Sequence, residues 1–139
     1  MEKINKNDFF VNFLKKNHLK PTNQRFAIAR FLFNGNNKHF TAEDLHEKIR
    51  FEKNKISLAT IYNTLHSFVE KKLLKQISIK KGRTIFCTNM SSHHHFFDSS
   101  TGKLIDIPKN EIKFKKTPQT PDDMQIDSID VVINLSKKN

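Results

Sequence analysis

The sequence of 139 residues has little cysteine and no long apolar run. A single cysteine, Cys87, excludes an internal disulfide framework and any zinc site built on CxxC pairs. No stretch of about 18 consecutive apolar residues is present, so we expect no membrane-spanning helix and no membrane partner. The polar start, MEKINKND, lacks the apolar segment of a secretion signal, which leads us to expect a cytoplasmic protein.

Motifs that identify common enzyme classes are also missing. The sequence contains no glycine-rich phosphate loop, no HExxH zinc motif and no clear pairing of an activated nucleophile with a base. We therefore predict that the protein is not an enzyme. A metalloenzyme is the weakest alternative, because it needs an open metal coordination position and a general base, and the sequence clearly offers neither.

The excess positive charge is confined to one part of the chain. Residues 1–87 hold 18 lysines and arginines against 7 acids, whereas residues 88–139 hold 7 of each. Lysines placed near phosphates release counterions on binding, so this distribution favours a polyanion such as double-stranded DNA. Charge placed for solubility, or the Lys- and Asn-rich composition of an AT-rich genome, is the alternative explanation.

The segment from Ile56 to Leu74, ISLATIYNTLHSFVEKKLL, predicts an amphipathic helix capped by Ser57. Its polar face carries short side chains, lacks acids until Glu70 and is framed by lysines, which suits the DNA major groove. An ordinary amphipathic helix is the alternative interpretation. The polar face consists of Ala59, Thr60, Asn63 and Ser67, flanked by Tyr62 and His66.

Three shorter helices and a hairpin complete the first predicted domain. Thr22 is predicted to cap the second helix, and Thr41 with Asp44 resembles a capping box at the start of the third. Two alternating segments flank a Lys81-Gly82 turn and predict a β-hairpin, which after a helix-turn-helix is a wing. The basic wing tip includes Arg83 and is expected to touch phosphates. The helices are predicted at residues 8–16, 23–33 and 42–52, and the strands at 75–79 and 83–87.

A second, smaller unit is predicted to consist mainly of strands. A turn at residues 99–102 separates two strands, and a short helix or irregular crossover follows. The last segment alternates strictly between apolar and polar residues, which indicates a strand with one buried side. Fewer than 50 residues bury little core, so we expect pairing with a second copy. The predicted strands are 93–98, 103–107 and 126–135, and the crossover is 109–125.

Three adjacent histidines begin the first of these strands. Side chains alternate along a strand, so His93 and His95 share one face and His94 lies on the other. The predicted turn places Asp106 directly opposite His95. Two imidazoles beside a carboxylate suit a borderline divalent metal such as Zn, Fe or Mn. Two residues of the first domain, His39 and the softer ligand Cys87, are further candidates.

Four motifs, in this order and spacing, resemble the ferric uptake regulator family over nearly the whole chain: LKPTNQRFAI, HFTAEDLHEKI, SLATIYNTLHSF and HHHFFDSSTGKLIDI. The resemblance implies an α+β fold, with an N-terminal winged helix-turn-helix DNA-binding domain followed by a small α/β dimerisation domain. We place these domains at residues 1–88 and 89–139. The resemblance also implies a homodimer that binds AT-rich palindromic operators.

The resemblance further implies roles for individual residues. Tyr62 would contact bases in the major groove, and Lys20 would approach the minor groove. With the polar helix face, the wing and the implied backbone contacts, the predicted DNA-binding set is Lys20, Arg25, Ser57, Thr60, Tyr62, Asn63 and Arg83. The regulatory metal site of the family matches His39, His93, His95 and Asp106, to which we add Cys87, where the family usually has an acid.

Departures from the family pattern indicate a branch. Asp98 and Thr101 occupy places of the CxxC cysteines, so no structural zinc is expected, and Ile129 replaces the histidine of a further metal site. The HHHFF run and the IDSIDVVINL ending are similar to the iron response regulator branch of α-proteobacteria. That similarity implies haem at His93, His94 and His95, although the Cys-Pro haem motif is absent.

The resulting hypothesis is a DNA-binding transcriptional regulator, repressor or activator, of iron- and haem-responsive genes. Haem or a divalent metal at the histidines would set its DNA affinity, because a ligand between the domains changes the angle of the two winged helices. The alternative is a haem or metal carrier that shows no preference for specific DNA.

Overall fold

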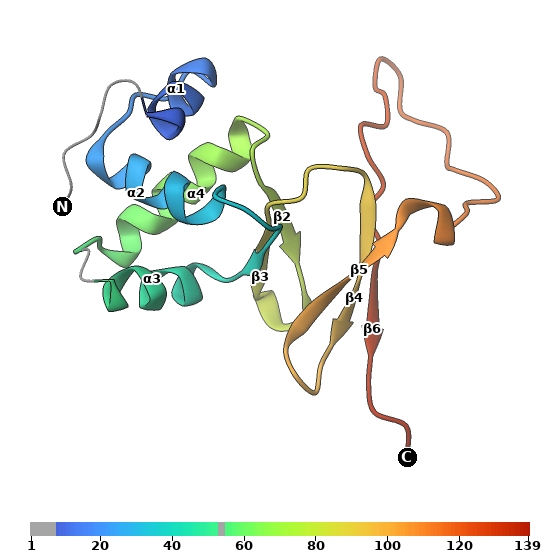
Figure 1. Ribbon diagram of the computed structural model, residues 1–139. Coiled ribbons are helices and arrows are strands. Elements are labelled where there is room, and N and C mark those ends of the chain that lie inside the picture. Colours follow the sequence, from blue (N-terminus) through green and yellow to red (C-terminus); the bar gives the residue numbers. More distant parts are fainter. Residues whose placement is uncertain (1–7, 53–54) are drawn as a thin grey trace. The chain divides into compact units, whose positions relative to one another are not determined.

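The structure is a computed structural model, and it describes residues 8–52 and 55–139. Backbone contacts divide the chain into two compact units, residues 1–90 and 91–139, each with one three-stranded sheet (Figure 1). Within the described ranges, no helix is both long and apolar enough to cross a bilayer.

Four α-helices build most of the first unit, and Thr22, Thr41 and Ser57 cap three of them as predicted. Asp8, expected inside the first helix, is its N-cap and accepts a hydrogen bond from the Phe10 N–H. The Thr22 hydroxyl accepts a hydrogen bond from the Arg25 N–H at 3.1 Å. Thr41 and Asp44 form the reciprocal capping box, with distances of 3.0 and 3.1 Å. The helices are α1 (Phe9–Lys16), α2 (Asn23–Leu32), α3 (Ala42–Phe51) and α4 (Leu58–Glu70).

The apolar stripe of α4 forms the centre of this unit's core. Ile61, Leu65 and Phe68 are fully buried in one cluster with buried residues of the other three helices. Replacing such a leucine by alanine typically costs about 2–5 kcal/mol, so the stripe holds α4 in one orientation. The polar face is consequently turned outward, and Ala59 and Asn63 are exposed.

A small antiparallel sheet follows α4. β2 (Lys75–Ser78) and β3 (Thr84–Cys87) form the predicted wing, joined through the 3-10 turn η1 (Lys80–Gly82). Gly82 has a φ of +68°, a left-handed conformation that glycine adopts without strain. An additional strand, β1 (His39–Phe40), pairs with the other edge of β3 and gives the order β1-β3-β2. Two residues are too few for a periodic pattern, so the sequence did not predict β1.

The second unit is a mixed sheet. β4 (His93–Asp98) and β5 (Lys103–Pro108) form an antiparallel hairpin in the predicted register. β6 (Val132–Leu135) adds in parallel to the other side of β4, which gives the order β5-β4-β6. The crossover contains one short 3-10 helix, η2 (Lys109–Glu111), and is otherwise irregular, as expected.

The last strand is shorter than predicted. We expected a strand over Ile126–Leu135 with one buried side, but only Val132–Leu135 pairs with β4. Ile126 and Ile129 are exposed, and every residue of β6 retains some exposure. The cause lies in the partner strand. β4 begins at His93, so the residues before position 130 have no strand beside them in this register.

Candidate metal centre and nucleic-acid interface

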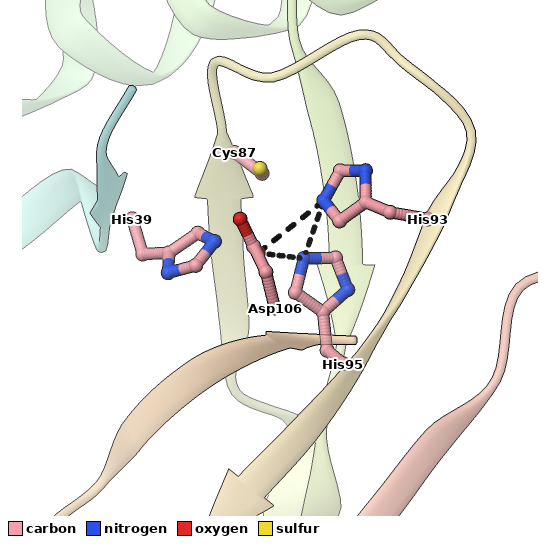
Figure 2. Close-up of side chains that lie close together, drawn as sticks. All are labelled: His39, Cys87, His93, His95 and Asp106. Atoms are coloured by element: carbon pink, nitrogen blue, oxygen red, sulfur yellow. Dashed lines mark hydrogen bonds and ion pairs between the residues drawn. The ribbon is translucent and has the colours of Figure 1, made fainter. Parts of the chain in front are cut away.

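Three metal-binding side chains of the second unit converge on one point (Figure 2). His93 and His95 lie on the same face of β4, and Asp106 stands opposite His95 on β5, which confirms the predicted register. The two histidine Nε2 atoms are 2.9 Å apart. Asp106 Oδ1 lies 3.4 Å from His93 Nε2 and 3.2 Å from His95 Nε2. Both imidazoles are buried, whereas the carboxylate is partly exposed.

These spacings fit a single metal ion. Tetrahedral zinc, with ligand bonds of about 2.0–2.1 Å, places its donor atoms about 3.3 Å apart. The measured separations of 2.9, 3.2 and 3.4 Å lie around that value. Two nitrogens and one carboxylate oxygen suit a borderline ion such as Zn, Fe or Mn. The residues present therefore fit a divalent metal, with room for further ligands.

The Ser91 carbonyl determines which ring nitrogen of His93 is free to bind a metal. His93 Nδ1 lies 2.6 Å from the Ser91 carbonyl oxygen, and because that oxygen only accepts, Nδ1 carries the proton. In the neutral ring, Nε2 then presents its lone pair toward His95 and Asp106. A carbonyl that accepts from the other ring nitrogen also fixes the orientation of a metal-binding histidine.

His94 takes no part in this triangle. It lies on the other face of β4, as strand alternation predicts, and its Nδ1 accepts a hydrogen bond from the Val131 N–H at 3.1 Å. The ring meets Phe114 edge-on, with centroids 5.9 Å apart. The lone pair of Nδ1 is thus used to hold the chain that leads into β6.

Two further candidate ligands lie in the first unit. His39 of β1 and Cys87 of β3 are directly opposite each other, so their side chains share one face of that sheet (Figure 2). Cys87 is fully buried, and its Sγ lies 3.9 Å from the Asn89 carbonyl oxygen. The sequence named both residues separately. Their pairing depends on β1, which the sequence did not predict.

The outer face of α4 carries the predicted small polar groups. Ser57 Oγ accepts from the Thr60 N–H at 3.1 Å and donates to Thr60 Oγ1 at 2.9 Å. These two hydroxyls therefore hold each other at the N-terminus of a 13-residue helix, where the helix dipole favours an anion such as a phosphate. Asn63 is exposed one turn further along the helix.

The three predicted cationic DNA contacts of this unit lie before α2 (Lys20), in its first turn (Arg25) and at the end of the η1 turn (Arg83). Arg25 Nη1 donates to the Lys20 carbonyl oxygen at 3.0 Å, which ties the exposed Lys20 to the start of α2. Arg83 is exposed where the η1 turn ends and β3 begins. The unit that carries α4 therefore also presents these three cations.

Tyr62 has a partner that sequence reasoning missed. Its hydroxyl donates a hydrogen bond to Glu43 Oε1 on α3. That hydrogen bond, with smaller contributions from desolvation and the Glu43 charge, raises the pKa of Tyr62 above its usual value. The two residues are 19 positions apart on different helices, so no local pattern indicates the contact.

Comparison with known proteins identifies the family. The model of the ferric uptake regulator family matches residues 16–134. This chain belongs to the ferric uptake regulator family. The ferric uptake regulation protein of Haemophilus influenzae is 30% identical over 104 residues, which cover 74% of this chain and 71% of that protein. The peroxide operon regulator of Bacillus subtilis is 32% identical over 94 residues, or 68% of this chain and 64% of that protein.

Solved structures of ferric uptake regulators share the fold. The regulator from Pseudomonas aeruginosa with manganese superposes with a TM-score of 0.72 at 22% identity, covering 95% of this chain and 100% of that one. The regulator from Vibrio cholerae gives a TM-score of 0.70 at 20% identity, covering 91% and 98%. The predicted α+β class, with an N-terminal helical region and a C-terminal mixed sheet, is thereby confirmed.

Membership confirms the coarser functional predictions. The ferric uptake regulator family consists of metal-responsive transcription regulators that bind DNA and are not enzymes. The cluster around His93, His95 and Asp106 is consistent with a divalent metal site. The relatives are ferric uptake and peroxide regulators, so the iron response regulator branch stays a prediction.

Replacing His95 by alanine is expected to weaken Co(II) binding by more than about tenfold, because the triangle loses one of its three donors. Cobalt absorbance titration of the purified protein measures the affinity. His66→Ala, which removes an exposed histidine of α4, serves as the control and leaves the affinity unchanged. Equal affinities of wild type and His95→Ala would contradict the assignment.

Proposed function

We propose that this chain is a homodimeric transcription regulator that binds AT-rich palindromic operators of iron-responsive genes under the control of a divalent metal. Residues 1–88 bind DNA, and residues 89–139 dimerise and sense the metal. The observation that carries this proposal is the donor triangle of His93, His95 and Asp106, which follows the winged helix after a very short connection. Such a regulator works in the cytoplasm, where bacterial DNA lies.

DNA recognition is assigned to α4 and its surroundings. The core stripe turns the polar face outward, and the first unit carries all the excess positive charge of the chain. Side chains that reach base edges determine sequence preference, whereas cations on phosphates add affinity for any sequence. Tyr62 and Asn63 belong to the first group, and Lys20 and Arg83 to the second.

Dimerisation is assigned to the second unit. Its 49 residues bury few apolar side chains, and the sheet has two open edges in β5 and β6. Exposed strand edges and apolar groups are usually covered in native proteins. A second copy of the unit is the proposed cover. The exposed apolar side chains are Ile105, Phe114, Met124, Ile126, Ile129 and Ile133.

His39 and Cys87 are proposed to complete the metal centre. Only residues 88–92 separate Cys87 from His93, so the two Cα atoms lie within about 20 Å of each other in any arrangement of the units. A metal bound by His39 and Cys87 as well as by the triangle of the second unit would join the units rigidly. In a dimer this restricts the angle between the two reading helices, which must fit half-sites about 34 Å apart.

A thiolate in the centre gives a direct test of this joint site. We expect the Co(II) complex of the wild type to show a thiolate-to-cobalt charge-transfer band, since Cys87 is the only cysteine. Cys87→Ser should abolish the band. Cys87→Asp, which introduces the acid usual in the family, should lose the band yet keep most of the affinity. A wild-type complex without the band would exclude Cys87 as a ligand.

DNA-binding measurements on variants should distinguish residues that read bases from residues that contact phosphates. Tyr62→Ala is expected to reduce the preference for a selected palindrome over random DNA. Lys20→Ala or Arg83→Ala should instead weaken both equally and lower the salt slope of log Kd by about one each. Fluorescence anisotropy at several salt concentrations measures both effects.

Lys137→Ala removes a lysine from the electrically neutral part of the chain and serves as the matched control. The absence of any salt-dependent, sequence-selective binding by the metal-loaded wild type would overturn the proposed function. It would favour a metal carrier instead.

Haem bound at the histidines is the second candidate effector. It is suggested by the resemblance to the iron response regulator branch. His93 and His95 can offer Nε2 to haem iron, whereas His94 already uses Nδ1 to accept from Val131. In the neutral ring its Nε2 carries the proton, so ligation by His94 would require this hydrogen bond to break.

A haemin titration tests this candidate. A saturable Soret band that His93→Ala loses and His94→Ala retains is the result expected for haem at the triangle. Zinc added beforehand should compete with it, because both use the same nitrogens. Weak, equal binding by all three proteins would leave the divalent metal as the effector.

A further inference from the structure

The contact between Tyr62 and Glu43 lies on the surface that the proposed function assigns to DNA. Tyr62 belongs to α4, the reading helix, while Glu43 lies in the first turn of α3. Their hydrogen bond is exposed and links the two helices of the helix-turn-helix. Glu43 takes no part in the capping box of α3, which uses Thr41 and Asp44.

This hydrogen bond has a direction that matters for base recognition. A tyrosine hydroxyl has one proton to donate and lone pairs that accept, whereas an ionised carboxylate only accepts. The proton of Tyr62 is therefore used by Glu43, and the phenol oxygen presents only its lone pairs to other groups. A second hydrogen bond at this oxygen must come from a donor.

Major-groove edges of the bases differ in this respect. Adenine and cytosine present exocyclic amino donors, while guanine and thymine present carbonyl acceptors at the equivalent places. We propose that Glu43 is a positioning residue for specificity, which holds the Tyr62 hydroxyl as an acceptor and so favours an adenine or cytosine amino group where Tyr62 meets a base. This inference rests on the proposed DNA-binding function.

The charge of Glu43 is the competing explanation for any effect of its removal. An exposed carboxylate beside the reading helix repels phosphates and lowers affinity for every sequence alike. Control of the hydroxyl direction instead changes the ranking of bases at one position. On α4 itself, the ring of His66 lies one turn further along, with its centroid 6.4 Å from that of Tyr62.

Four variants separate these two effects. Glu43→Asp keeps the negative charge and the helix N-terminal acid but withdraws the carboxylate by one methylene, while Glu43→Ala removes it. Tyr62→Phe removes the hydroxyl alone. Glu47→Ala is the charge control, because Glu47 lies on the same helix and pairs with Arg50 at 2.9 Å.

Each metal-loaded protein is used to select sequences from a randomised palindromic DNA library. We expect Glu43→Asp and Glu43→Ala to lower the preference for amino-bearing bases at one position by about three- to tenfold, the size expected of one hydrogen bond. Tyr62→Phe should lose the preference at the same position. Glu47→Ala should keep the wild-type ranking while binding all sequences more tightly.

Tyrosine absorbance provides an independent measurement on the same proteins. Tyr62 is the only tyrosine and the chain has no tryptophan, so a spectrophotometric pH titration follows this hydroxyl alone. Loss of Glu43 should bring the raised pKa of Tyr62 back toward its ordinary value, whereas Glu47→Ala should leave it unchanged.

Two results would overturn the inference while leaving the proposed function intact. One is a wild-type ranking of bases in both Glu43 variants, and the other is a tyrosine pKa that Glu43→Ala does not lower. A wild type that selects no sequence at all would overturn the proposed function itself, and this inference with it.

Discussion

The pairing of His95 with Asp106 is the constraint on which the candidate metal centre depends. Side chains alternate along a strand, so a shift of one residue between β4 and β5 would move the carboxylate to the opposite face of the sheet. The four-residue turn that joins the strands sets this register. Asp98 accepts hydrogen bonds from the N–H and the hydroxyl of Ser100, at 2.9 and 2.6 Å, which lowers its pKa. Gly102 supplies the positive φ. The chemistry of an exposed turn thus determines the geometry of a site several residues away.

An equivalent constraint acts in the first unit. The buried stripe of α4 leaves that helix one stable rotation about its axis, and its polar face follows from that rotation. The contacts between helices and the capping hydroxyls then fix the positions of Ser57, Thr60 and Tyr62. The proposed DNA-contacting residues and the core residues therefore occupy two faces of the same helix, so a rotation of α4 about its axis would displace both sets together.

Features that depend on local chemistry, such as helix caps and short turns, could be predicted from the sequence. Helix starts at Thr22, Thr41 and Ser57 were visible because capping chemistry is local, and the β4–β5 hairpin was visible because its turn is short. The parts that escaped prediction depend on tertiary contacts. β1 is only two residues long, and the contact between Tyr62 and Glu43 joins different helices. The final strand was predicted too long, because the alternation of apolar and polar residues indicates which side of a strand is buried but not how far the neighbouring strand, β4, extends.

In the candidate metal site too, the local features could be predicted and the tertiary contacts could not. The spacing of His93, His95 and Asp106 was accessible from strand alternation and one turn. The Ser91 carbonyl behind His93 and the Val131 N–H on His94 were not, since both belong to irregular backbone. These contacts separate the role of His94, which holds the chain before β6, from that of His93, which points Nε2 into the triangle. Chemically identical neighbours are thus made distinct by the strand face they occupy and by the backbone groups around them.

The short connection between Cys87 and His93 has a consequence for affinity. A tether of five residues confines the pair His39 and Cys87 to a small volume around the three donors of the second unit, which corresponds to an effective concentration on the order of millimolar. If His39 and Cys87 join His93, His95 and Asp106 on one ion, as proposed, their capture of that ion is an intramolecular event. The strength of such a chelate would then depend on linker length as well as on the ligands themselves, so the residues between Cys87 and His93 would contribute to metal affinity without binding the metal.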